Sequence, residues 1–202
     1  SDLTINHCTI TGCGSAEQNG AANSVGVVFL NGGKAKISNS TFSKNWAMIG
    51  PGICAWNTNL TLNGVQVTDN LCIGDGYNAS TGEPDKGNIT WWQGAGLYIQ
   101  NCTLSISNTN IMGNKGSFIG GGMYITGTDV ALDSSVQISG NSAVCGGGIY
   151  TDDSKHTITV NGAIISNNTA VSKTAYSRYS TYNGNGAGIA NDEGSVVVQS
   201  GE

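Results

Sequence analysis

The sequence predicts an all-β protein that folds as a parallel β-helix, in which short strands wind around one axis and stack coil upon coil. Three observations support this prediction. A motif that combines an alternating strand, an asparagine and a glycine-rich turn recurs along the chain. Good helix formers are sparse, and Gly, Asn, Thr and Ser interrupt every window. Repeats of this size cannot bury a hydrophobic face alone, whereas stacked repeats merge their inward residues into one continuous core.

Each repeat has three parts in a fixed order. The first is an alternating strand, whose inward positions are Ile37, Leu60 with Leu62, Leu104 with Ile106, Val130 with Leu132, and Ile158 with Val160. The second is an apolar residue three positions before an asparagine, as in Phe42/Asn45, Val67/Asn70, Ile111/Asn114, Ile138/Asn141 and Ile165/Asn168. The third is a turn that reads GPGI, GAGL, GGGM, GGGI or GAGI and includes Gly122, Gly148 and Gly188.

These asparagines and glycines are expected to shape the corners of the coils. Both residue types tolerate the left-handed backbone that sharp corners require. Side-chain amides that stack at one corner can form a hydrogen-bonded ladder. Glycine also leaves room where a turn runs close to its neighbour, so we assign both sets of residues structural roles.

The spacing of the motif sets the size of the predicted coil. Asn114 and Asn141 lie 27 residues apart, with nothing inserted between them. A degenerate first coil fits residues 3–30 with Cys13 at the asparagine position, and SVVVQSGE begins a seventh coil that is cut off. We therefore expect six to seven coils of about 26 residues in a single domain over residues 1–202. The termini lack capping elements, so the chain is expected to be a fragment of a longer protein.

The charge balance argues against nucleic acid and anionic membranes as partners. Charged residues make up 10% of the 202-residue chain, the net charge is −5, and the 8 Lys and Arg residues form no basic cluster. No apolar run approaches the ~20 residues that span a bilayer, so this fragment is not expected to insert into a membrane.

The six cysteines show no CxxC pair and no metal-ligand spacing with His7 or His156. We interpret them mostly as small buried hydrophobic residues. The alternative is a disulfide framework, for which the sequence does not choose the pairing, and Cys8–Cys13 is the first pair to check.

The paired motifs resemble the repeats of chlamydial polymorphic outer-membrane proteins, which combine Phe-x-x-Asn with Gly-Gly-apolar-apolar. Residues 42–45 (FSKN) match the first motif literally, and residues 121–124 (GGMY) and 147–150 (GGIY) match the second. The other coils replace Phe with Val or Ile and loosen the glycine pair. The resemblance covers almost the whole chain and implies a right-handed β-helix in a secreted or cell-surface protein, typically an adhesin-like passenger. Such repeats also occur in surface proteins of other microbes.

Three insertions interrupt the repeat in the same slot, between the asparagine corner and the glycine turn. Coil three carries IGDGYNASTGEPDKGNITWWQ, coil six carries VSKTAYSRYSTYNGN, and coil one carries GSAEQNGAANS. They are expected to emerge along one edge. Coils three and six are three rungs apart, or ~14 Å by strand spacing, so their insertions can form one surface.

The two long insertions combine rigid aromatic side chains with small polar residues, a mixture typical of antibody binding loops. The candidate ligand-binding residues are Tyr77, Trp91, Trp92, Tyr176, Arg178, Tyr179 and Tyr182. Aromatic faces beside Asn, Asp and tyrosine hydroxyls also suit a sugar ring. The alternative is that these aromatic side chains fold back and cover the side of the helix, and both roles can hold at once.

Four acidic residues form a second candidate site. Asp152 with Asp153 and Asp192 with Glu193 follow two glycine turns at matching offsets, so a four-carboxylate patch on adjacent rungs is expected. Three interpretations remain open: a solvated acidic turn, a Ca²⁺ site, and a glycosidase pair with carboxyls ~5 to 9 Å apart across a cleft. We assign no catalytic residue and expect no cofactor other than this alternative Ca²⁺.

The features together predict an extracellular or cell-surface, adhesin-like binding module that is not an enzyme. Its target would be a host or microbial surface glycan or protein, and other domains of the parent chain would be its neighbours. The first alternative is a β-helix carbohydrate-active enzyme, either a polysaccharide lyase or a glycoside hydrolase. The second is a passive structural stalk that projects another domain.

Overall fold

The computed structural model describes residues 2–14, 25–72, 77–78, 83–84, 93–116, 118–171 and 185–200, of which 77–78 and 83–84 are described by their backbone alone. The described residues form strands and turns without a helix, and nearly all strand pairs are parallel. The all-β prediction is therefore confirmed, and the arrangement is consistent with a β-solenoid. Accordingly, this part of the chain offers no helix that could cross a membrane.

The strands gather in several separate sheets. One contains β1 (Asp2–Asn6), β4 (Lys34–Ser38), β8 (Asn59–Asn63) and β14 (Thr103–Ser107). A second contains β2 (Thr9–Thr11), β5 (Thr41–Ser43), β9 (Gln66–Thr68), β15 (Asn110–Met112), β18 (Gln137–Ser139) and β21 (Ile164–Ser166). The third contains β3 (Phe29–Asn31), β7 (Ile53–Trp56), β13 (Leu97–Gln100), β16 (Met123–Thr126), β17 (Val130–Asp133), β20 (Ile149–Asn161) and β23 (Ile189–Ser200).

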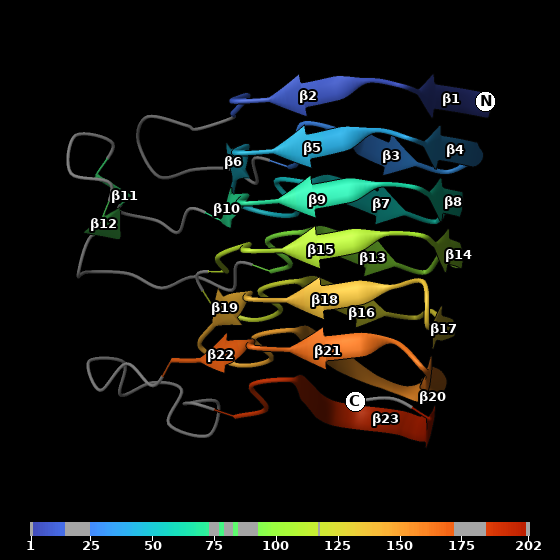
Figure 1. Cartoon of the computed structure of the whole chain (residues 1–202), viewed down its shortest axis with the longest axis vertical. Coiled ribbons are helices and arrows are strands. Elements are labelled where there is room, and N and C mark those ends of the chain that lie inside the picture. The colour runs from blue at the N-terminus through green and yellow to red at the C-terminus, as the bar shows by residue number, and fades with distance from the viewer. Residues whose placement is uncertain are drawn as a thin grey trace.

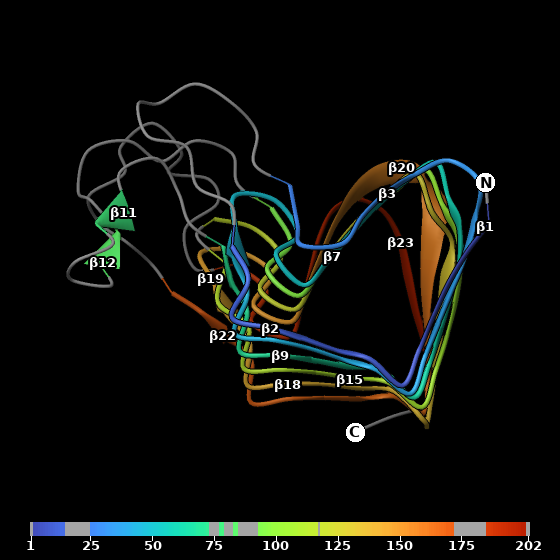
Figure 2. The same ribbon diagram turned by 90° about the horizontal axis from the view of Figure 1, so that it is seen from above.

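Three short pairs complete the structure. Two are parallel and lie at one corner of the stack: β6 (Trp46–Ala47) with β10 (Leu71–Cys72), and β19 (Ser142–Ala143) with β22 (Thr169–Ala170). The third, β11 (Tyr77–Asn78) with β12 (Glu83–Pro84), is antiparallel. It lies outside the stack on the side of that corner (Figures 1 and 2).

The repeats stack in register, as the motif alignment predicts. In the second sheet, Ile111 pairs with Val67 of the preceding coil and Ile138 of the next. Figure 1 shows the strands of successive coils one below another, and Figure 2 shows them superposed into walls when viewed along the stack. The strand after the glycine turn of coil five continues directly into the first strand of coil six. Together they form β20, which pairs with both β16 and β17.

One hydrophobic cluster fills the interior of the stack. It includes predicted inward residues that are fully buried, such as Ile37, Leu60 and Leu132, whereas Leu104 is only partly buried against it. Full burial of each such side chain stabilises the fold by roughly 1.5–3 kcal/mol. The inward residues of consecutive coils therefore act as one continuous core.

The corner asparagines form a buried ladder of amides. Asn70 donates its backbone N–H and its Nδ2 to Oδ1 of Asn114, at 3.0 and 2.9 Å. Asn114 repeats both bonds to Asn141 at 2.9 and 3.0 Å, and its Nδ2 also donates to the backbone oxygen of Val67 at 2.9 Å. In coil one, the backbone N–H of Cys13 donates to Asn45 Oδ1 at 3.0 Å. Cys13 thus occupies the asparagine position of that coil.

At this corner the left-handed backbone conformation is taken by the residue before each ladder asparagine. This corrects the prediction from the sequence, which placed that conformation at the asparagines themselves. These preceding residues all have positive φ: Gly12, Lys44, Asp69, Gly113, Gly140 and Asn167. The sharp turn falls there because the next residue must direct its amide into the ladder. At Lys44 and Asp69 the conformation is adopted at some cost, because side chains disfavour it.

The glycine turns run against each other too closely for side chains. A Cβ on Gly122 would lie 2.5 Å from the backbone oxygen of Gly148 and 3.0 Å from Asn141 Nδ2. A Cβ on Gly148 would likewise lie 2.4 Å from the backbone oxygen of Gly188 and 2.9 Å from Asn168 Nδ2. A Cβ on Gly188 would meet only Ile165 Cγ2, at 3.8 Å, so this glycine is not required by its described surroundings.

None of the six cysteines forms a disulfide with another. Cys54, Cys72 and Cys145 are buried, and Cys8 and Cys13 are exposed. A Cys8–Cys13 bridge is absent because the extended strand β2 runs between the two residues. Burial is the main cause that raises the pKa of Cys54 to about 12 and that of Cys145 to about 11.

Replacing Asn114 with alanine should destabilise the protein by about 3 kcal/mol or more, because two donors of Asn70 lose their acceptor in a buried site. Urea denaturation measures the effect as a lower midpoint at unchanged slope. Asn59→Ala, at an exposed position of β8, is the matched control and should shift stability by less than about 0.5 kcal/mol. Equal shifts for both variants would contradict a stabilising ladder.

Thiol titration should distinguish the exposed from the buried cysteines. At pH 8, Cys8 and Cys13 should react rapidly with a disulfide reagent, whereas Cys54 and Cys145 should react only after unfolding, because their raised pKa values keep them protonated. Denatured protein should release all six thiols. Failure of two thiols to react without reductant would show a disulfide and refute the free-thiol arrangement.

Candidate functional site

The three sequence insertions leave and rejoin the stack at one corner. Before the insertions, Gly14 bridges to Trp46, Cys72 pairs with Ala47, and Ala170 pairs with Ala143. After them, Val25 bridges to Ile49, Gln93 bridges to Ile119, and Gly146 donates its backbone N–H to the oxygen of Asn185. The departure points therefore lie in one row and the return points in another.

The uninterrupted coils show what the slot looks like without an insertion. In coil two, Met48 alone links Ala47 to Ile49, and in coil five Val144 alone links Ala143 to Cys145. The insertions therefore lie between the departure row and the return row, which a single residue connects in coils two and five. This places their ends along a single edge of the stack.

The predicted ligand-binding side chains lie outside the described residues. For Tyr77 only the backbone is described, in β11. The others are Trp91, Trp92, Tyr176, Arg178, Tyr179 and Tyr182. Their contacts with each other or with the stack stay predictions.

A partly buried aromatic residue, Trp46, stands in the departure row and was not singled out from the sequence. Its ring covers Gly14, where a Cβ would collide with it. Together with Leu71 it packs on the small buried cluster of Met48, Cys72 and Ala95. The available signal was its position directly after Asn45, in a row where the other coils carry Gly, Leu, Lys, Ser and Thr.

A row of buried tyrosines lines the outer face of the third sheet and was also missed. Tyr98, Tyr124 and Tyr150 occupy the same register, with ring centroids 4.9 and 5.9 Å apart and interplanar angles of 18° and 9°. Trp56 and Phe29 extend the row through edge-to-face contacts. The sequence signal was a tyrosine two residues after a glycine in three successive turns, read as GLY, GMY and GIY.

The tyrosine hydroxyls bind two of the four predicted acidic residues. Tyr124 donates to Asp152 Oδ2 at 2.7 Å, and Tyr150 donates to Asp192 Oδ2 at 3.1 Å. Asp152 and Asp192 therefore each accept a hydrogen bond from the tyrosine hydroxyl of the preceding coil, although Glu193 rather than Asp192 is paired with Asp152. Burial and the neighbouring Asp152 carboxylate raise the pKa of Tyr124, which keeps its hydroxyl protonated as a donor.

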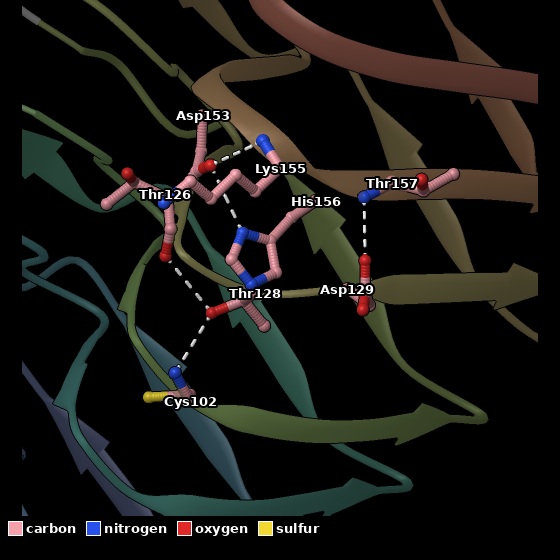
Figure 3. Close-up of polar contacts among 8 residues, drawn as sticks. All are labelled: Cys102, Thr126, Thr128, Asp129, Asp153, Lys155, His156 and Thr157. Atoms are coloured by element: carbon pink, nitrogen blue, oxygen red, sulfur yellow. Dashed lines mark hydrogen bonds and ion pairs between the residues drawn. The ribbon is translucent and has the colours of Figure 1, made fainter.

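The other two acidic residues have different surroundings. Asp153 Oδ1 accepts the backbone N–H of Lys155 at 2.8 Å and lies 3.1 Å from His156 Nδ1 (Figure 3). These contacts, led by the Lys155 amide, lower the pKa of Asp153. Glu193 is exposed and stands opposite Asp152 in the β20–β23 pairing, across a register shift.

The Asp153–His156 turn is part of a corner held by backbone and side-chain bonds. Asp129 Oδ1 accepts the backbone N–H of Thr157 at 2.7 Å, and the Thr128 hydroxyl accepts the backbone N–H of Cys102 at 3.0 Å (Figure 3). Six residues separate Thr151 from Ile158, whereas four separate their partners Ile125 and Val130, so this corner is two residues longer than the corner of the preceding coil. Among the described residues, no group of three or more His, Cys, Asp or Glu side chains is arranged to hold a metal ion.

Comparison of the chain with protein families, with curated proteins and with solved structures finds no match. The geometry of the described residues is therefore the basis for a functional proposal.

Replacing residues 73–92 with a single valine, as at Val144, should leave the coil folded. In coil five the single residue Val144 joins the two rows in which Cys72 and Gln93 lie. The free energy of unfolding should therefore change by less than about 1 kcal/mol. Far-UV circular dichroism and thermal melting measure this. Deleting residues 97–116, an equal length that includes β13, β14 and β15, is the control and should abolish cooperative melting. Unfolding by the first deletion would contradict the shared slot.

Proposed function

We propose that the chain is a segment of a right-handed parallel β-helix of six to seven coils from a secreted or cell-surface protein. In this proposal it serves as an adhesin-like binding module, and it needs no cofactor. The target is a host or microbial surface glycan or protein. The resemblance of its repeats to those of chlamydial polymorphic outer-membrane proteins supports this class.

The observation that carries the proposal is the shared slot of the insertions. The described ends of the coil-three and coil-six insertions, at Cys72, Gln93, Ala170 and Asn185, lie in two rows of one corner. Three rung spacings of ~4.8 Å separate the two coils, a distance that loops of this length span. Residues far apart in sequence can therefore contribute to one recognition surface.

The composition of the insertions supports recognition as the role of this edge. Tryptophan and tyrosine supply large contact area with few rotatable bonds, and the surrounding Ser, Asn, Thr and Gly residues supply adaptable hydrogen bonds. The stack beneath gives these loops a rigid base. Binding loops on a rigid scaffold are a common arrangement for recognition.

One observation favours a carbohydrate-active enzyme as the second candidate. Asp152 and Asp192 lie on adjacent rungs, and each accepts a hydrogen bond from a tyrosine hydroxyl. Adjacent rungs are ~4.8 Å apart, close to the ~5–5.5 Å that separates the two carboxyl groups of retaining glycosidases. Product release from a polysaccharide panel that is lost in Asp152→Asn and Asp192→Asn would favour this candidate. A passive stalk would show neither product nor binding.

Replacing Trp91, Trp92 and Tyr179 with alanine should abolish binding to a glycan array and to cells while the melting temperature stays within about 3 °C, because contact area is lost but the core is untouched. Phe29→Ala, an exposed aromatic change outside the insertions, is the control and should bind like the parent chain. A parent chain without binding to either the array or cells would refute the proposal.

A further inference from the structure

Five aromatic rings form a continuous aromatic row on the outer face of the third sheet. Consecutive ring centroids lie 5.0 Å (Phe29–Trp56), 6.3 Å (Trp56–Tyr98), 4.9 Å (Tyr98–Tyr124) and 5.9 Å (Tyr124–Tyr150) apart. All four separations fall within the ~4.5–7 Å that is typical of aromatic pairs in contact. Trp56 is half-buried, whereas the three tyrosines are at most 6% exposed. The row therefore connects an indole at the surface with buried phenols.

The first two tyrosines of the row differ in the group that accepts the hydrogen bond of the hydroxyl. Tyr98 donates to Gln100 Oε1 at 2.9 Å, and an amide oxygen does not take up a proton at neutral pH. Tyr124 donates to Asp152 Oδ2 at 2.7 Å, a length typical of a hydroxyl that donates to a charged oxygen. Among the described residues, Oδ1 of Asp152 is buried without a hydrogen-bond partner. Tyr124 thus has a proton acceptor in place, and Tyr98 does not.

We propose that the aromatic row is a relay that carries an oxidising equivalent from Trp56 to Tyr124 and holds it there as a neutral tyrosyl radical. A one-electron oxidant in solution, such as the ferryl haem of a peroxidase, removes an electron from the indole and is itself reduced. An electron from Tyr124 then refills the indole through the Tyr98 ring, and the hydroxyl proton of Tyr124 moves to Asp152 Oδ2. A soluble thiolate or ascorbate anion later returns one electron, and the proton goes back to the phenol oxygen.

Charge and burial make Tyr124 the end of the relay. In the described part of the chain, Trp56 Nε1 is buried without a hydrogen-bond partner, so the oxidised indole has no group to which it can pass its proton. An oxidised Tyr98 would carry a positive charge at a buried position, which is costly. At Tyr124 the loss of an electron and the shift of the proton convert a phenol and a carboxylate into a radical and a carboxylic acid, both uncharged. The step therefore leaves no charge at this pair.

Two other oxidisable groups lie along the row. Cys54 stands in register with Tyr98, but burial is the main cause that raises its pKa to about 12, so the readily oxidised thiolate is absent at neutral pH. Tyr150 also has a carboxylate partner, but its hydroxyl lies 3.1 Å from Asp192 Oδ2 and its ring is one contact farther from the indole. The radical therefore forms first at Tyr124.

The relay gives the protein an oxidation sink that is separate from ligand recognition. It draws oxidising equivalents from the surface to a phenol that is 4% exposed, where a radical is shielded from other molecules. None of its residues belongs to the insertions, so the relay and the recognition surface can fail independently.

The test is oxidation of the whole chain by ruthenium(III) tris-bipyridine, generated by a light flash, with detection of radicals by electron paramagnetic resonance. A reference chain keeps only the tyrosines of the row, because phenylalanine replaces the four tyrosines of the insertions, Tyr77, Tyr176, Tyr179 and Tyr182. This chain should form a tyrosyl radical. Formation should be slower in D2O than in water, because a proton moves with the electron.

Variants of the reference chain then test each part of the relay. Tyr124→Phe and Asp152→Asn should each slow radical formation about tenfold or more, because the phenol or its proton acceptor is lost. The asparagine can still accept the hydrogen bond of Tyr124, so the fold is preserved. Trp56→Phe should also slow radical formation, because the entry point is lost. Asp133→Asn, an exposed carboxylate on β17, is the control and should leave the rate unchanged.

Any one of three results would overturn the relay: no tyrosyl radical in the reference chain, an equal rate in water and D2O, or an unchanged rate in the Tyr124, Asp152 or Trp56 variant. Melting temperatures are measured alongside. If the four insertion replacements lower the melting temperature, the same variants are compared in the parent chain. The part of the radical signal that Tyr124→Phe removes there belongs to the row, and no loss of signal would again refute the relay.

Discussion

The structure depends on one constraint, the register imposed by the buried corner amides. Asn114, for example, accepts from Asn70 in the coil before it and donates to Asn141 in the coil after it. A buried amide without partners costs several kcal/mol, so a slip of one residue would be penalised at every rung at once. Hydrophobic burial drives the stacking, but apolar residues of similar size interchange easily. The amides are what make one alignment of the coils much better than its neighbours.

The fixed register turns a linear repeat into aligned rows with separate roles. Inward rows build the core, and the glycine row lets successive turns approach. Outward rows carry the stacked tyrosines and the features that differ between coils, such as Ala190 in place of tyrosine and the ends of the insertions. Because the insertions leave the stack at an outer corner, they can differ between coils without disturbing the inner rows. This separation explains how one scaffold can carry insertions of different lengths along a single edge.

The periodicity of the sequence was sufficient to predict the stacking of coils, their inward residues and the place of Cys13, since each follows from spacing alone. The tyrosine row was not predicted because its burial depends on corner segments around Ile119 and Cys145 that fold onto the outside of the sheet. The left-handed residue was placed one position too late because spacing does not reveal which of two adjacent polar residues turns the chain. Asp152 and Asp153 were expected to act together, but alternation along β20 sends their side chains to different neighbours. The roles assigned to the insertion aromatics stay predictions.

Native-state hydrogen exchange of the ladder amides tests the central claim most directly. If the amide ladder locks the register, the backbone N–H groups of Asn45, Asn70, Asn114 and Asn141 should exchange only through global unfolding, with the slowest rates in the chain. Exchange of these four amides through local opening, at rates like those of exposed strand residues such as Asn59, would contradict it.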